Sequence, residues 1–226
     1  MLKPEMKISA KKEQSAGTRN ALIMTGARLF ASKGYHAVSV RELTSEAGVN
    51  LATVSYHFGG KSGLYEAIFR YIITRHDEIT PSAEEVRKRW AASPDTPQGK
   101  CEVVDWYVST LVHGLIGPEY HIWACILLSH EITQPTELFP LLEKEFFKPA
   151  QAGLLAFVDG ALPPGTDREE RVITAQIVIN MCLKFLESER LISKWIGWDQ
   201  YGEYGINKIA TVISKRIRGM LGLPME

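Results

Sequence analysis

Apolar residues recur along this chain at helical intervals. From Thr18 to about Phe30 they fall mostly three, four and seven positions apart, which is the spacing of one face of an α-helix. Gly34 follows directly after Lys33, as is typical of a helix end. No segment alternates apolar and polar residues for long enough to indicate a strand. The pattern therefore predicts an all-α fold.

Capping signals divide the next segment into short helices. Ser39 and Glu42 form a capping box, in which the hydroxyl and the carboxylate can each satisfy a free backbone N–H. This helix should end at Ala47-Gly48, and Asn50 is a suitable N-cap for the following one. Further helices are expected over residues 51–58 and, after a break at Gly59-Gly60, from Lys61 towards Ile79.

The remainder of the chain also follows helical periodicity. Ser82 and Glu85 form a second capping box, and Thr166 and Glu169 form a third. Joints rich in proline and glycine separate the segments. Beyond the helix that starts after Ser82, helices are expected at about residues 99–116, 119–132, 136–161, 167–195 and 200–221.

The segment from Ser39 to Lys61 fits a helix-turn-helix. Two short helices meet at Ala47-Gly48-Val49, where a small residue and a glycine allow a steep crossing. The second helix of such a motif enters the major groove of duplex DNA with its N-terminal residues at the base edges. Val54 and Phe58 would then face the core. Lys61 opens the next helix and is suited to bind a phosphate together with the free N–H groups there.

The side chains expected to face DNA are mostly short, polar or aromatic. Thr53, Tyr56 and His57 can donate hydrogen bonds to phosphates. The alternative is an ordinary helical hairpin within a bundle. The predicted DNA-binding residues are Ser39, Arg41, Asn50, Leu51, Ala52, Thr53, Ser55, Tyr56, His57 and Lys61.

The distribution of charged residues along the chain adds to the predicted domain organisation. The 226 residues carry 26 basic and 26 acidic side chains, so the net charge is zero. Residues 1–78 hold eleven basic and seven acidic side chains, a net +4, which leaves −4 for the rest. This asymmetry indicates one part that faces an anion and one with another role. We expect a flexible basic arm at 1–17, which either contacts DNA or is a solvated tail, a DNA-binding domain at 18–78 and a second domain at 79–226.

The same residues carry a family resemblance. The pattern runs through Ala27, Leu29-Phe30, Lys33–Tyr35, Ser39–Leu43, Ala47–Val49, Thr53–Lys61 and Leu64-Tyr65. In residue types and spacing, residues 18–70 resemble the DNA-binding domain of the TetR family of transcriptional regulators. Many members carry tyrosine at the place of Ser55, which Tyr56 follows here. Sparser motifs are similar to the CecR-type subgroup: Asn50–Lys61, Glu131 with Pro135-Thr136, and Pro149.

The resemblance implies a homodimeric repressor with an N-terminal helix-turn-helix domain of three helices and a larger helical domain for ligand binding and dimerisation. A small-molecule effector would favour a dimer whose recognition helices no longer fit successive major-groove turns, and the operator would be released. The fourth helix, expected from Lys61 towards Ile79, would transmit the effect of the ligand to the DNA-binding domain, because it would contact both domains. Alternatives are a co-repressor, a regulator without a ligand, or a small-molecule-binding protein that does not act on DNA.

Aromatic and histidine side chains in the second domain are candidates for a pocket that takes a small, largely apolar ligand. The alternative is that most of them belong to the core. The candidate ligand-binding residues are Trp106, Tyr107, His113, Trp123, His130 and Phe147.

Apolar stripes also run along the last two helices. Two such helices from each subunit would form a four-helix interface about a two-fold axis, unless the stripes face their own core. A helix-turn-helix reader needs two half-sites for adequate specificity, which favours the dimer. The predicted interface consists of Ile173, Ile177, Met181, Ile206, Ile209, Ile213 and Ile217.

Other classes of function lack their signatures. The widely spaced Cys101, Cys125 and Cys182 predict buried thiols in a reducing cytosol. Gln134 stands where a zinc-protease helix needs its second histidine, and Ser55 where a phosphate-binding loop needs its first glycine. We therefore expect no catalytic residue, no metal and no cofactor. No signal peptide or apolar run of membrane length is seen, so a cytoplasmic protein without a membrane partner is expected.

Overall fold

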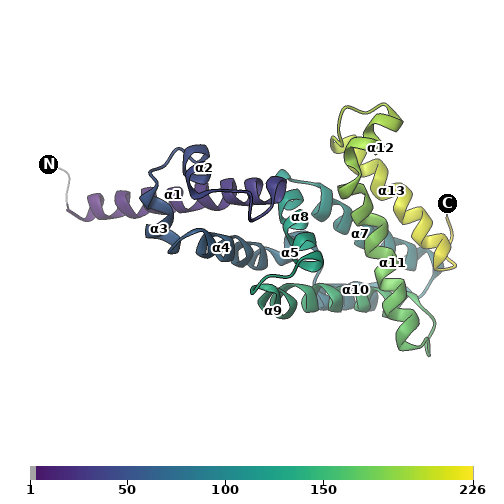
Figure 1. Ribbon diagram of the computed structural model, residues 1–226. Coiled ribbons are helices and arrows are strands. Elements are labelled where there is room, and N and C mark those ends of the chain that lie inside the picture. Colours follow the sequence, from purple (N-terminus) through teal and green to yellow (C-terminus); the bar gives the residue numbers. More distant parts are fainter. Residues whose placement is uncertain (1–3, 226) are drawn as a thin grey trace. The chain divides into compact units, whose positions relative to one another are not determined.

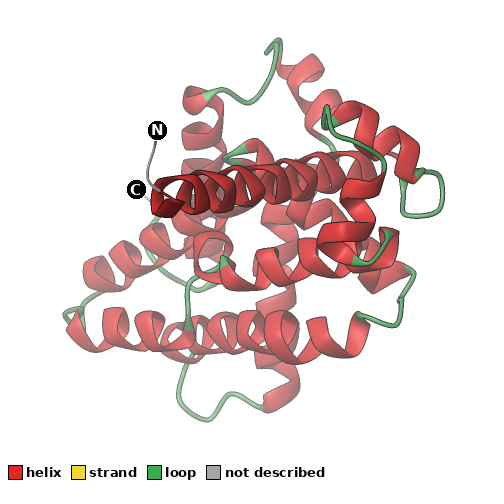
Figure 2. Cartoon of the chain, turned by 90° about the vertical axis from the view of Figure 1, so that its left-hand side faces the viewer, coloured by secondary structure: helices red, strands yellow, loops and turns green. Residues whose placement is uncertain are grey.

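The computed structural model describes residues 4–225, with side chains from residue 15 onward, and every regular element in that range is a helix (Figures 1 and 2). The all-α fold class is therefore confirmed. The first helices are α1 (Pro4–Lys33), α2 (Val40–Glu46), α3 (Ala52–Phe58), α4 (Lys61–Thr74), α5 (His76–Ile79), α6 (Ala83–Ala92) and α7 (Pro97–Ile116). They are followed by α8 (Glu119–Thr133), α9 (Phe139–Leu142), a π-helical turn (Glu143–Phe147), α10 (Lys148–Ala161), α11 (Arg168–Glu187), α12 (Glu189–Ile196) and α13 (Glu203–Met220).

The chain forms two compact units. Unit 1 comprises Met1–Thr74 together with Trp123–Phe139, and unit 2 comprises Arg75–Ile122 together with Pro140–Glu226. The boundary expected at residue 78 thus lies at Thr74, where α4 ends and Arg75 leaves the helical conformation. Residues 123–139, which we assigned to the second domain, group with the first.

The N-terminal arm differs from expectation. Helix α1 begins at Pro4, so residues 4–17 are helical where we expected a segment without regular structure. Residues 1–3 lie outside the described range, as do the side chains of Lys7, Lys11 and Lys12.

Two of the long helices that we expected are interrupted. The segment 136–161 contains a π-helical turn that ends immediately before Lys148-Pro149. Proline lacks an N–H and its ring clashes with the carbonyl four residues back, which a wider turn relieves. The segment 167–195 breaks at Ser188, whose backbone leaves the helical region (φ −115°, ψ 15°).

The hydroxyl half of the predicted capping boxes is present at two helices, and at a third the cap is displaced by one residue. Ser39 Oγ accepts a hydrogen bond from Glu42 N at 3.1 Å, and Ser82 Oγ accepts one from Glu85 N at 3.2 Å. The cap of α11 is Asp167, which accepts from the backbone N–H of Glu170 at 2.9 Å. The predicted cap, Thr166, instead donates its hydroxyl to a preceding carbonyl.

The core of unit 1 is formed where α1 crosses α4 and where α2 and α3 pack beside them. Its fully buried side chains come from all four helices and include Leu22, Phe30, Leu43, Val54 and Ile68. Burial of large aliphatic and aromatic groups contributes about 1.5–3 kcal/mol for each side chain. This packing fixes the two short helices, which are too short to be stable alone.

The core of unit 2 is built around α7. The ring of Tyr107 on α7 stacks on Phe157 of α10, with centroids 4.1 Å apart and planes 8° from parallel. At the other end of α7, a Cβ on Gly114 would overlap the backbone carbonyl of Ile79. Glycine at that position therefore lets α5 approach α7 closely.

No single helix in residues 4–225 is long and apolar enough to cross a membrane; α7 and α8 reach that length and composition only as a bent pair.

Candidate nucleic-acid interface

The turn between α2 and α3 has helix-turn-helix geometry. Helix α2 ends at Glu46, and the N–H of its C-cap residue Ala47 donates to Leu43 O at 3.0 Å. Gly48 then adopts a positive φ of 64°, a conformation that glycine reaches without the penalty of a Cβ. Val49 N donates to Thr44 O at 2.9 Å, which closes the turn. The sequence signal at Ala47-Gly48-Val49 therefore corresponds to a tight, hydrogen-bonded turn.

Helix α3 is fixed from its inner side. Val54 is fully buried, as expected, and Phe58 is half-buried beneath the guanidinium of Arg19, 5.3 Å from the ring centroid. Gly59 caps the helix in the left-handed conformation (φ 74°), and its N–H donates to Ser55 O at 2.9 Å. Val54 and Phe58 therefore fix the inner face of α3, and Gly59 fixes its C-terminal end. The outer face of the helix is left free to contact another molecule.

The outer face of α3 carries most of the residues predicted to bind DNA. Asn50, Leu51, Ala52 and Ser55 are exposed, and Tyr56 is 81% exposed. Asn50 also caps the helix start, because its Oδ1 accepts from Ala52 N at 2.8 Å. The exposed side chains of Leu51 and Tyr56 gain no free energy from burial within the protein. Contact with a DNA groove would bury part of their apolar surface.

The remaining predicted DNA-binding residues flank that face. Thr53 and His57 are half-buried, and the imidazole of His57 lies edge-on to Tyr56 with centroids 5.0 Å apart. Arg41 is exposed on α2. The hydroxyl oxygen of Ser39 accepts the capping hydrogen bond of α2. A contact of this hydroxyl with DNA would therefore have to form in addition to the capping bond.

Lys61 opens α4, as the sequence predicted. Its ammonium lies over the ring of Tyr35, 4.4 Å from the centroid, and 6.0 Å from that of Phe30. Partial burial lowers the pKa of Lys61 from its ordinary value of 10.5. The aromatic platform holds the ammonium at the N-terminus of α4, where the helix dipole and free N–H groups attract an anion.

Ion pairs brace the same unit away from α3. Arg28 on α1 pairs with Glu46 on α2 at 2.6 Å, and Lys33 pairs with Glu42 at 2.5 Å. The hydrogen bond from Lys33 lowers the pKa of the Glu42 carboxyl. Glu42 therefore uses its carboxylate to join α1 to α2, whereas the capping box predicted a bond to its own helix.

The six candidate ligand-binding residues are distributed between the units. Trp123 and His130 lie in unit 1 and the other four in unit 2. Tyr107 is a core residue, and Trp106 lies beneath the guanidinium of Arg89, 4.3 Å from its centre. His113 lies within hydrogen-bond distance of Ser109 O (2.7 Å) and of Asn207 Oδ1 (3.1 Å), so it joins α7 to α13. His130 is exposed, and Phe147 is half-buried.

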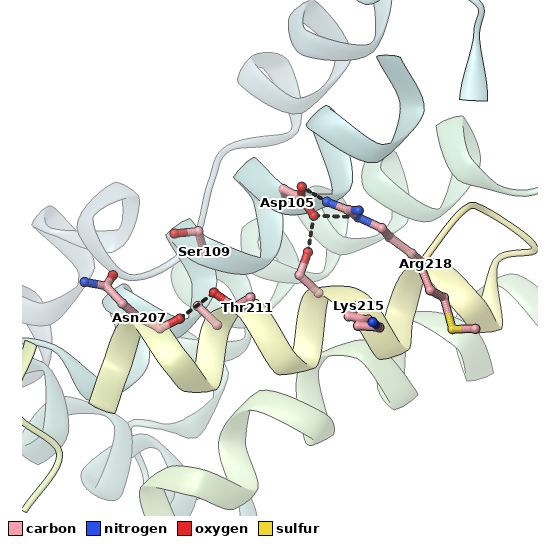
Figure 3. Close-up of a pocket in the computed structure, with 9 residues that line it drawn as sticks. Asp105, Ser109, Asn207, Thr211, Lys215 and Arg218 are labelled. Carbon is pink, nitrogen blue, oxygen red and sulfur yellow. Dashed lines mark hydrogen bonds and ion pairs between the residues drawn. The ribbon is translucent and has the colours of Figure 1, made fainter. Parts of the chain in front are cut away.

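A groove of about 720 Å³, lined mostly by polar residues, lies between α7 and α13 and contains none of those six residues (Figure 3). The carboxylate of Asp105 accepts hydrogen bonds there from Ser214 and from the guanidinium of Arg218. The sequence carries no distinct signal for this groove, because isolated polar residues at helical spacing also occur on any solvated helix face. Its lining is Asp105, Ser109, Asn207, Ala210, Thr211, Ser214, Lys215, Arg218 and Met225.

The predicted dimer residues separate into two groups. Ile173 and Ile177 on α11 are exposed, and Met181 and Ile206 are half-buried. In contrast, three isoleucines of α13 are buried in the core of unit 2 against α7, and the prediction that they form the interface was wrong: Ile209, Ile213 and Ile217. Their stripe faces its own core, which was the alternative reading of the same periodicity.

Among the described residues, the cysteines and the other potential ligands of metals do not cluster. Cys101, Cys125 and Cys182 are free and buried. Burial raises the pKa of the Cys125 and Cys182 thiols to about 12, so both are inert as nucleophiles near neutral pH. Within the described residues no group of three or more His, Cys, Asp or Glu side chains is arranged to hold a metal ion.

An exposed reading helix fixed on a small helical core, followed by a second helical unit, defines a helix-turn-helix transcriptional regulator. Residues 22–68 match the family model of bacterial regulatory proteins of the TetR family. Residues 105–223, more than half of the chain, match the C-terminal domain of the HTH-type transcriptional dual regulator CecR. The chain therefore belongs to the TetR family of DNA-binding transcriptional regulators, with a C-terminal domain of the CecR type.

Relatives agree with this assignment, and they are transcriptional regulators rather than enzymes. CecR of Shigella flexneri is 23% identical over 186 residues, which cover 82% of each chain. The probable regulator YttP of Bacillus subtilis (strain 168) is 45% identical over 49 residues, only 22% of this chain and 24% of YttP. The crystal structure of AibR with isovaleryl coenzyme A and operator DNA shares the fold, with a TM-score of 0.63, 18% identity, and coverage of 91% of this chain and 96% of AibR.

Proposed function

We propose that this regulator is a dimeric repressor that releases its operator when a small, largely apolar ligand binds. The observation that carries the DNA-binding part is the outer face of α3. Tyr56 and Leu51 are exposed there, while Val54 on the opposite side is fully buried. A helix anchored on one side with apolar and polar groups presented on the other is suited to a major groove.

Each part of that face has a separate role in the proposal. Asn50, Leu51 and Ala52 at the start of α3 approach base edges, where the leucine can contact a thymine methyl. Tyr56 donates its hydroxyl to a phosphate. Lys61 and the N-terminus of α4 bind a further phosphate, which sets the register of α3 in the groove.

Dimerisation is proposed through the outward faces of the last long helices. Ile173 and Ile177 project from α11, and Tyr204 and Val212 are exposed on α13. A two-fold pair of these faces is self-complementary and supplies two reading helices for two half-sites. Because Ile209, Ile213 and Ile217 are core residues, the proposed interface uses the opposite side of α13.

The ligand part of the proposal is supported by the fold neighbour AibR, whose structure was determined with isovaleryl coenzyme A and operator DNA. Only the isovaleryl group of that molecule is small and apolar like the ligand that we expect, because coenzyme A itself is polar and anionic. Trp106, Trp123 and Phe147 are half-buried apolar groups and remain candidates to contact such a group. Tyr107 is a weaker candidate because it already stacks on Phe157.

A second candidate function is ligand-dependent activation or co-repression. The relative CecR is named a dual regulator, so its family domain is compatible with more than one direction of control. In that case the ligand would tighten operator binding. The two candidates differ only in which DNA-binding state the ligand prefers.

The test begins with selection of genomic fragments bound by the purified full chain, which yields the operator. The fluorescence anisotropy of labelled operator is then followed during titration with isovaleryl coenzyme A, with free coenzyme A as the matched control. Release by the acylated compound alone supports an inducer, and tighter binding supports a co-repressor. Failure to select any sequence above background would overturn the DNA-binding proposal, and indifference to isovaleryl coenzyme A would exclude that acyl group.

A further inference from the structure

A cavity of about 510 Å³ lies where α12 meets the joint that leads to α13. Both elements lie within unit 2, and Figure 1 shows α12 directly before α13. The volume falls within the range of about 300–1,000 Å³ that is usual for small-molecule sites. None of the six candidate ligand-binding residues lines it. The lining consists of Glu189, Arg190, Ser193, Lys194, Trp198 and Asp199.

The side chain of Ser193 is a buried polar group within this lining. Ser193 is only 3% exposed, and its Oγ has no hydrogen-bond partner in the part of the chain that the structure describes. Its backbone carbonyl, in contrast, accepts hydrogen bonds from the N–H groups of Gly197 and Trp198, at 2.9 and 2.8 Å. Buried polar groups in proteins nearly always have a partner. The Ser193 hydroxyl therefore indicates that a polar group of another molecule belongs beside it.

Charges of opposite sign reach the cavity from its two bordering segments. Arg190 and Lys194 are exposed, and because they are four residues apart they share one face of α12. Among the described residues, neither cation forms an ion pair, and the same holds for Asp199, which is exposed on the joint. The carboxylate of Glu189 accepts a hydrogen bond of 3.2 Å from Tyr201 N. The helix thus supplies two unpaired cations and the joint supplies an unpaired carboxylate.

The indole of Trp198 forms an apolar wall that is held in place. Its ring lies edge-on to that of Tyr201, with centroids 6.2 Å apart and planes at 86°. A Cβ on Gly205 would come within 3.0 Å of the indole, so the ring packs closely on α13. Gly197 turns the chain out of α12 in the left-handed conformation (φ 84°). A site whose wall is already ordered loses little conformational freedom when a ligand binds.

We propose that this cavity binds a small zwitterion, namely a free amino acid with an apolar side chain. The carboxylate of the ligand is held by Arg190 and Lys194 and accepts a hydrogen bond from the Ser193 hydroxyl. Its ammonium group pairs with Asp199, and its side chain packs on the ring of Trp198. This site goes beyond the proposed function, whose ligand is largely apolar and whose candidate residues lie elsewhere in the chain.

A simple anion is the competing ligand, because a guanidinium and an ammonium group are sufficient to hold a carboxylate or a phosphate. The acidic side chains in the lining favour the zwitterion. Glu189 and Asp199 would repel an anion that carries no positive charge. A cationic ligand would be repelled by Arg190 and Lys194 in the same way. Only a ligand with both charges pairs with the groups of both segments.

The ligand class is tested by isothermal titration calorimetry of the full chain with L-phenylalanine and, separately, with L-leucine. Phenylpropanoate lacks the ammonium group of L-phenylalanine, and phenylethylamine lacks its carboxylate, so these two compounds are matched controls. We expect saturable binding of at least one amino acid and dissociation constants at least about tenfold higher for both analogues of L-phenylalanine. The inference is overturned if neither amino acid binds, or if phenylpropanoate or inorganic phosphate binds as tightly as the amino acids.

Substitutions in the lining test where the amino acid binds. Ser193→Ala, Lys194→Gln and Asp199→Asn should each raise its dissociation constant about tenfold. Lys144→Gln is the control, because Lys144 is exposed in unit 2 and lies outside the cavity. Unliganded Ser193→Ala should melt at the temperature of the wild type, since it loses no hydrogen bond. A lower melting temperature would assign the hydroxyl to the fold, and unchanged affinity in all three variants would place binding elsewhere; either result contradicts the inference.

Discussion

The hydroxyl of Tyr65 donates a hydrogen bond of 3.1 Å to Oε1 of Glu131, a carboxylate that is only 1% exposed. Thr136 supplies two further donors to the same carboxylate, its backbone N–H at 3.1 Å and its hydroxyl at 2.9 Å. A buried carboxylate needs such donors to offset its lost hydration. This network joins α4 to the end of α8 and explains why residues 123–139 belong to unit 1.

Removal of one donor should destabilise unit 1. We expect Tyr65→Phe to lower the free energy of unfolding by about 1 kcal/mol, because the buried carboxylate loses one of its donors and keeps only those of Thr136. Urea unfolding followed by circular dichroism measures the change. Tyr56→Phe removes a hydroxyl from a ring that is 81% exposed, and without DNA present it should leave the free energy of unfolding unchanged. Equal stability of wild type and Tyr65→Phe would show that the bond contributes nothing.

Stability should fall at alkaline pH because of the buried thiols. Burial raises the pKa of Cys182 from 9.0 to about 12, so the folded state retains a proton that the unfolded state loses. Its contribution is complete below about pH 9 and is lost as the pH rises towards 12. Tyrosines titrate in the same range, so the measurement is the difference between wild type and Cys182→Ala. The variant should show the flatter decline; parallel curves would contradict the raised pKa.

Operator affinity should depend on Tyr56 and Lys61 in different ways. Tyr56→Ala should weaken binding by about 1–3 kcal/mol, and Tyr56→Phe separates the hydroxyl from the ring. Lys61→Ala should weaken binding to all sequences and reduce the slope of log K against log salt by about one. Lys88→Ala is the control, because Lys88 forms an exposed ion pair with Glu84 on α6 in unit 2. Unchanged affinity and slope in both variants would refute the placement of the contacts.

The turn from α3 to α4 should not tolerate a side chain at Gly63. A Cβ there would overlap the backbone carbonyl of Phe58, whereas a Cβ on Gly17 of α1 meets nothing within 4 Å. We expect Gly63→Ala to displace α3, lower the melting temperature and reduce operator binding at least about tenfold. Gly17→Ala should be neutral or stabilise by up to about 1 kcal/mol. Differential scanning calorimetry and anisotropy test both, and wild-type operator affinity in Gly63→Ala would contradict the expectation.

The helix-turn-helix was predictable because its determinants are local. Ser39, Gly48 and Gly59 act on backbone atoms within four residues of themselves, so residue type and spacing suffice to recognise them. The same holds for Val54, whose burial follows from helical periodicity. Once Val54 is assigned to the inner side of α3, the residues on its outer face follow from the same helical periodicity.

The C-terminal prediction failed where one pattern allows two structures. The stripe containing Ile209, Ile213 and Ile217 fits a dimer interface and a core equally well, since both bury apolar area. Only the packing of α13 on α7 decides between them. The bond between Tyr65 and Glu131 spans 66 positions, and a single sequence holds no signal for such a pair.

The sequence by itself determined the helices, the turn at Gly48 and the residues available to α3, because these depend on interactions between near neighbours along the chain. The tertiary structure decided which apolar stripes are core, that residues 123–139 belong with the reading unit, and that the buried Ser193 lines a cavity with Arg190 and Lys194. Burial depends on what packs against a surface, and this is a property of distant segments brought together by folding.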